Sequence, residues 1–166
     1  MTENARPYQR IEDDVRQFFA ELVQRLPEGA AVLSERPGSF PEGLVVTLAP
    51  RRPDAAALTM DAHNGSGTVH LHAGLGTLLE VVFPEDRYTG VTSLKAEFGP
   101  ICEAVLAGRI SEVVWHRGKE LVRCSTRILL DNGTRWRGYY SNSAASLLRI
   151  GESKQLVQYC SYTASP

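Results

Sequence analysis

Residues 110–140, with the sequence ISEVVWHRGKELVRCSTRILLDNGTRWRGYY, decide the fold of this chain. Runs of β-branched and aromatic residues alternate here with short turn segments, and this pattern predicts three antiparallel strands. The segment 131–133, Asp-Asn-Gly, is a hairpin signal. A three-residue turn places Ile128 opposite Trp136, so that apolar side chains stay together, and gives Gly133 a positive φ without steric cost. The preceding hairpin, around 116–119, is less decisive, because either register leaves one polar residue on its apolar side.

The three-residue turn sorts the strand side chains onto two faces. The apolar face, which we expect to meet the core, carries Val122, Cys124, Thr126, Ile128, Trp136 and Tyr140. The opposite face, called the arginine face below, carries Arg123, Arg127, Arg135, Arg137 and Tyr139. Arg127 then lies opposite Arg137, and such a like-charge pair is unfavourable unless an anion or an acidic side chain lies nearby.

The arginine face has two interpretations. In the first, the arginines lie in solvent, cover apolar surface with their stems and pair with Glu112, Glu120 or Glu152. In the second, they bind an acidic protein surface or a small anion, because guanidinium groups match planar carboxylate and phosphate groups. The second interpretation makes the arginines and Tyr139 a binding site.

Length and composition set the class of protein. The chain has 166 residues and is 43% hydrophobic, which predicts a single domain over residues 1–166 with a proper core. No apolar run approaches the roughly 18 residues that a membrane helix needs, and the first residues lack a signal-peptide pattern, so we expect a soluble, cytoplasmic protein without membrane contact. The cysteines are Cys102, Cys124 and Cys160, whose spacing predicts buried structural thiols.

The charge is unevenly distributed along the chain. The net charge of −1 argues against general binding to nucleic acid. Residues 1–108 contain 9 basic and 15 acidic side chains, whereas residues 109–137 contain 7 basic and 3 acidic ones. This asymmetry predicts that the acidic part faces the basic part, within one molecule or in a homodimer, or that the basic part is a binding surface.

The hairpin over residues 57–73 carries a second polar face. Its turn, 64–67, brings Asp61 opposite His70, and the same face also carries His63 and His72. These four residues are candidate metal ligands, because residues two apart on a strand can aim at one ion. Binding would weaken below about pH 6.5, where imidazoles protonate. The alternative is an ordinary half-solvated strand, since such strands alternate apolar and polar residues in any case.

The remaining pattern predicts the fold class. Apolar residues at helical spacing predict a first helix over about 8–26 and a second over about 94–106, which Gly99-Pro100 either kinks or begins. The expected order is helix, five strands, helix, four strands. We therefore expect an α+β domain with a mainly antiparallel sheet of about eight or nine strands, strongly curved or partly closed, covered on one face by two helices.

Several familiar activities are excluded by the motifs that are missing. The chain has no G-x-S-x-G, Walker, H-E-x-x-H or C-x-x-C motif, and Gly74 and Gly76 precede no helix, so they form no phosphate-binding loop. Cys124 with His116 is a poor nucleophile pair, because Cys124 should face the core. The sequence favours a non-catalytic binding protein without cofactor. The alternatives are a metal-dependent enzyme or sensor using the 57–73 hairpin, and a small-ligand cavity between sheet and helices.

Overall fold

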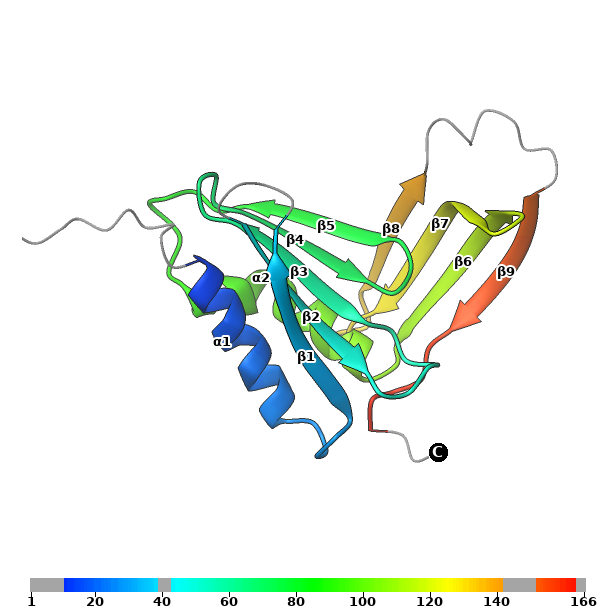
Figure 1. Cartoon of the computed structure of the whole chain (residues 1–166), viewed down its shortest axis with the longest axis horizontal. Helices are drawn as coiled ribbons and strands as arrows, with labels where there is room; N and C mark the ends of the chain where they lie inside the picture. Colours follow the sequence, from blue (N-terminus) through cyan, green and yellow to red (C-terminus); the bar gives the residue numbers. More distant parts are fainter. Residues whose placement is uncertain (1–10, 39–42, 142–151, 164–166) are drawn as a thin grey trace, which may run out of the picture.

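The computed structural model describes residues 11–38, 43–141 and 152–163. The elements follow in the order α1 (Ile11–Gln24), β1 (Ala31–Pro37), β2 (Gly43–Pro50), β3 (Leu58–His63), β4 (Thr68–Ala73), β5 (Thr77–Val82), α2 (Val91–Leu106), β6 (Ile110–Arg117), β7 (Glu120–Leu129), β8 (Arg135–Ser141) and β9 (Glu152–Gln158). Figure 1 shows the helices beside one sheet and a second sheet next to it. Within the described residues the fold is α+β with two helices and antiparallel strands, as the sequence predicts.

The strands form two separate sheets, so the prediction of one continuous sheet or a partly closed barrel is wrong. Strands β1 to β5 make a five-stranded meander, and the second sheet has the order β8-β7-β6-β9. The chain leaves the first sheet after β5 and passes through α2 before it reaches β6. Strand β6 pairs with β7 along one edge and with β9 along the other. Both edges of β6 are therefore occupied, and β5 is not its neighbour. One neighbour of β6 is thus the next strand in the chain, β7, and the other is β9, the last strand of the described residues.

The helices pack on one face of the five-stranded sheet. The buried stripe of α1 consists of Ile11, Val15, Phe18, Phe19 and Leu22. It belongs to one hydrophobic cluster with inward-facing residues of the sheet and of α2. The second helix begins at Val91 and runs through Pro100, so this proline lies inside the helix and does not begin it. The predicted Tyr8 end of α1 lies outside the described residues.

The register of the 120–141 hairpin is the one that the sequence predicts. Ile128 pairs with Trp136, Gly133 has a φ of 79°, and the amide of Leu130 donates to the carbonyl of Thr134. The inward face is buried along β7 but not along β8, because β8 is the edge strand. Tyr140 is 40% exposed, so the prediction that it meets the core is wrong.

A buried carboxylate joins the two sheets. Glu112 in β6 is 0% exposed, so it is not one of the solvent-facing partners proposed for the arginines. It accepts hydrogen bonds from the Leu75 amide at 2.8 Å, the Thr126 hydroxyl at 2.7 Å and the Tyr159 hydroxyl at 2.6 Å. Burial and the hydrogen bond to Glu112 raise the pKa of Tyr159, so its hydroxyl stays protonated as a donor. These three donors come from the β4–β5 turn, from β7 and from the segment after β9.

The β4–β5 turn lies so close to the four-stranded sheet that only glycine fits. A Cβ at Gly74 would lie 2.7 Å from Oε2 of Glu112, and a Cβ at Gly76 would lie 2.6 Å from Cβ of Cys124. Real Cβ atoms do not approach other atoms this closely, so any side chain would force the turn away. The two glycines therefore hold the turn against the carboxylate that its amide contacts.

Replacing Glu112 with alanine should destabilise the protein by about 3 kcal/mol, because one buried and two partly buried donors lose their acceptor and a cavity forms. The free energy of unfolding in urea measures the effect. The exposed Glu97 of α2 is a matched control, and Glu97→Ala should change stability by less than about 0.5 kcal/mol. Equal stability of the two variants would show that the carboxylate is not the joint between the sheets.

Candidate functional site

The outer face of the four-stranded sheet carries the predicted arginines. Strand pairing places Arg127 directly opposite Arg137 and places Arg135 opposite Leu129. On the other side of β7, Ser111 of β6 pairs with Arg127, and Gln158 of β9 pairs with Ser111. All three arginines are exposed. The register therefore forms a polar row across all four strands.

The row lies in a groove of about 520 Å³, called the arginine groove below. Its lining consists of Gly108, Arg109, Ile110, Ser111, Arg127, Ile128, Leu129, Arg135, Arg137, Gln158 and Tyr159. Four guanidinium groups thus surround one concave surface together with a hydroxyl and an amide. Such a donor set suits an anion, because guanidinium and amide groups all donate hydrogen bonds.

Three of the four guanidinium groups have no acidic partner among the described residues. No ion pair or side-chain hydrogen bond joins Arg127, Arg135 or Arg137 to any other described residue. Arg109 differs, since it pairs with Asp131 at 2.7 Å and donates to the Leu129 carbonyl at 3.1 Å. The like-charge contact across β7 and β8 is therefore not offset within this part of the chain.

Arg123 has a different environment from the groove. Its guanidinium lies 3.0 Å from the carboxylate of Glu152, whose side chain is 5% exposed, and 4.3 Å from the centre of the Trp115 ring. Arg117 contacts the same carboxylate at 3.9 Å. These contacts fit the first interpretation of the arginine face, in which the arginines pair with glutamates of the same chain. Arg123 therefore has a structural role. Tyr139 is 62% exposed and lies one row from Arg137, outside the groove lining.

Three groove residues were absent from the sequence-based site. Arg109 and Gln158 lie outside the predicted stretch 110–140, and Ser111 lies inside it but was not assigned to the arginine face. The alternation of side chains along β6 could have identified Arg109 and Ser111. Residues two apart on a strand share a face, so both lie on the same face as Trp115. Gln158 could not be found in this way, since nothing in the sequence reveals that β9 pairs with β6.

Comparison with known proteins assigns no role to the arginine groove. No protein-family model, curated protein or solved structure matches this chain. Among the helices of the described residues, none is long and apolar enough to cross a membrane.

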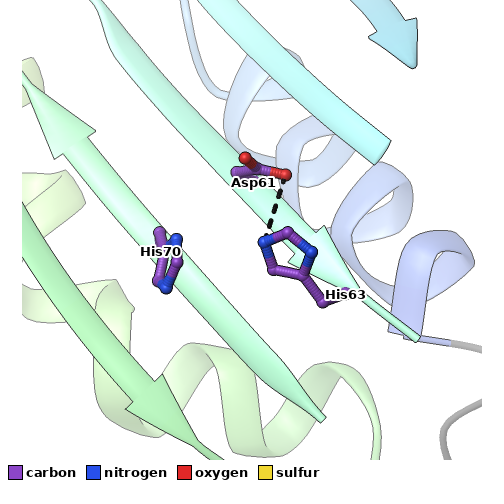
Figure 2. A group of neighbouring side chains, drawn as sticks. All are labelled: Asp61, His63 and His70. Atoms are coloured by element: carbon purple, nitrogen blue, oxygen red, sulfur yellow. Dashed lines mark ion pairs between the residues drawn. The ribbon is translucent and has the colours of Figure 1, made fainter. Parts of the chain in front are cut away.

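The predicted metal ligands lie on the other sheet, on the face of β3 and β4 opposite the helices. Asp61 pairs with His70, as predicted, and the donor atoms of Asp61, His63 and His70 all lie within 4.8 Å of one another. Figure 2 shows the two imidazoles and the carboxylate side by side. His72, the fourth predicted ligand, is not part of this group, and it pairs with Thr59 across the strands. Desolvation lowers the pKa of His72, and the nearby His70 lowers it further.

A further hollow lies between the two helices and the β7–β8 turn, not between sheet and helices. It has a volume of about 570 Å³, and its apolar lining includes Phe18, Leu22 and Leu130. Its charged residues are paired, Lys95 with Glu21 at 2.5 Å, Arg25 with Glu103, and Asp131 with Arg109 outside the hollow. These pairs already satisfy the charges, so the hollow has less to offer an ionic ligand than the arginine groove has.

The buried cysteine on the inner face of β7 has no features of a nucleophile. Cys124 is 0% exposed, and its sulfur lies 3.8 Å from the Thr126 hydroxyl. Burial, followed by the nearby charge of Glu112, raises the pKa of Cys124 to about 12. His116 pairs with Leu121 and not with Cys124. The thiol is therefore protonated at neutral pH and shielded from solvent.

Titration of the folded protein with Ellman's reagent at pH 8 should modify Cys160 slowly and should leave Cys102 and Cys124 unmodified. Burial raises the pKa of Cys102 and Cys124, and a hydrogen bond to Asp54 raises that of the partly exposed Cys160. Denaturant should release all three thiols. The Cys160→Ser variant should lose the reaction of the folded protein, and rapid modification of Cys124 in that variant would contradict its assignment as a structural thiol.

Proposed function

We propose that this protein is a non-catalytic binding protein that engages an acidic protein surface through the arginine groove. The observation that carries the proposal is the set of three exposed arginines, Arg127, Arg135 and Arg137, that line one concave surface without an acidic partner in the described residues. A folded chain gains nothing from such a cluster by itself, since like charges opposed across strands are destabilising.

Carboxylates are the complementary groups for this groove. A guanidinium presents two parallel N–H donors that match the two oxygens of a carboxylate, and charge-assisted hydrogen bonds of this kind are stronger than neutral ones. A carboxylate between Arg127 and Arg137 would turn their mutual repulsion into two attractions. The ion pair with Asp131 already holds the Arg109 guanidinium in place, so Arg109 forms a fixed edge of the groove beside the other three arginines.

The surroundings of the groove favour a protein surface over a free small anion. In the row next to the arginines, Tyr139 is 62% exposed and Leu156 is 61% exposed. Ser125 and Val113 connect these two residues across the sheet. Exposed aromatic and apolar side chains beside arginines are typical of protein interfaces. A free anion would use the groove and leave this row uncovered.

The double variant Arg127→Ser/Arg137→Ser tests the proposal. A fluorescein-labelled polyglutamate peptide is the probe, and fluorescence anisotropy measures its affinity at low salt. The double variant should bind the peptide at least about tenfold more weakly, because each charge-assisted hydrogen bond contributes about 1.5 kcal/mol or more. The folded state should be retained, since both side chains are exposed and make no contact that the fold uses.

The double variant Arg36→Ser/Arg51→Ser is the matched control. It removes the same charge from two exposed arginines on and beside the five-stranded sheet. The control should bind the peptide as the unmodified protein does. Equal losses in both variants would mean that net charge alone drives binding, and unchanged binding in the groove variant would overturn the proposal. Binding of inorganic phosphate but not of the peptide would reject the protein surface in favour of a small anion. Sedimentation of the protein with the peptide shows whether the species that binds is a monomer or a homodimer.

A further inference from the structure

The polar face of the five-stranded sheet holds a compact group of metal-ligating side chains. Asp61 and His63 project from β3, and His70 projects from β4 between them and β5 (Figure 2). The three side chains are only 15%, 10% and 23% exposed. Half-solvated strands usually place polar side chains well into water, so this degree of burial is unusual for such a face.

The distances within the group fit one ion. Nε2 of His63 lies 3.6 Å from Oδ1 of Asp61, and the ring centres of His63 and His70 lie 5.3 Å apart. Two donors bound to a tetrahedral zinc ion at 2.0–2.2 Å are separated by about 3.4 Å. The Asp61–His63 separation is close to this value. The full set lies within 4.8 Å, so small rotations of the side chains would bring all three donors to bonding distance.

A second observation points to a ligand. Oδ1 of Asp61 is buried from solvent and accepts no hydrogen bond in the described part of the chain. A buried carboxylate oxygen without a donor is costly, and a cation at bonding distance would remove that cost. This oxygen is the one that faces the His63 ring (Figure 2), and the donor atoms of His63 and His70 both lie within 4.8 Å of the Asp61 carboxylate.

We propose that Asp61, His63 and His70 bind a divalent transition-metal ion of the zinc class. Two imidazole nitrogens and one carboxylate favour zinc and its neighbours over magnesium or calcium, which prefer oxygen ligands only. Three protein ligands leave at least one coordination position to water. The site lies on the sheet that does not carry the arginine groove, so it stands independently of the proposed binding function.

Glu80 of β5 completes the surroundings. Its Oε2 lies 3.3 Å from Nε2 of His70, which it faces across the β4–β5 pair. A metal-bound imidazole commonly donates its second N–H to a carboxylate, which orients the ring and makes it a better ligand. Glu80 is placed for that role when Nδ1 of His70 binds the ion.

Isothermal titration of the metal-stripped protein with Zn²⁺ tests the site, with the visible absorption of bound Co²⁺ as a second readout. The unmodified protein should bind about one equivalent of Zn²⁺ and give the strong visible bands of tetrahedral Co²⁺. The variants Asp61→Asn, His63→Gln and His70→Gln should each lose at least about tenfold in affinity. Circular dichroism checks that each variant is folded. If one variant does not fold, the other two still test the site.

His72→Gln is the matched control, because His72 lies on the same strand and face as His70 but outside the group. It should keep the affinity of the unmodified protein. Less than a tenth of an equivalent of Zn²⁺ on the unmodified protein would overturn the proposal and leave Asp61 and His63 as an ion pair. Equal losses in His72→Gln and in His70→Gln would also overturn it, since they would indicate adventitious binding to surface histidines.

Discussion

The structure depends on one buried carboxylate, that of Glu112. A carboxyl group at zero exposure is tolerated only when its oxygens are hydrogen-bonded, and three donors from three separate segments meet this requirement. The turn between β4 and β5 can reach the carboxylate only because Gly74 and Gly76 have no side chains. The two sheets are thereby fixed to each other through a polar contact, although they share no strand.

The orientation of Glu112 also sets the outer surface of the second sheet. Because Glu112 points inward, its neighbour Ser111 points outward, and strand pairing extends this outward row to Arg127 and Arg137. The inner face thus combines the carboxylate with packed apolar residues, while the outer face gathers positive charge. The arginine groove and the Glu112 contact therefore lie on opposite faces of the same sheet and depend on the same strand register. A slip of one residue in that register would destroy both.

The two polar surfaces of the molecule differ in how their charges are satisfied. On the second sheet, Arg123 is held by Glu152 and Trp115, whereas Arg127, Arg135 and Arg137 lie open to solvent without an acidic neighbour among the described residues. On the first sheet, the Asp61 group is largely shielded from water. An open cluster of one charge suits an external partner, and a shielded mixed cluster suits a small ion.

Local rules determined much of this from the sequence alone. Turn chemistry at Gly133 and the alternation of side chains gave the hairpin register, the arginine face and the pairing of Asp61 with His70, because each depends on residues close together in the chain. Only the tertiary structure decided that the strands form two sheets, that β9 lies beside β6, and that Glu112 is the buried joint and not a surface partner. These features depend on contacts between segments far apart in sequence, where a strand pattern specifies which face is apolar but not which strand or turn will cover it.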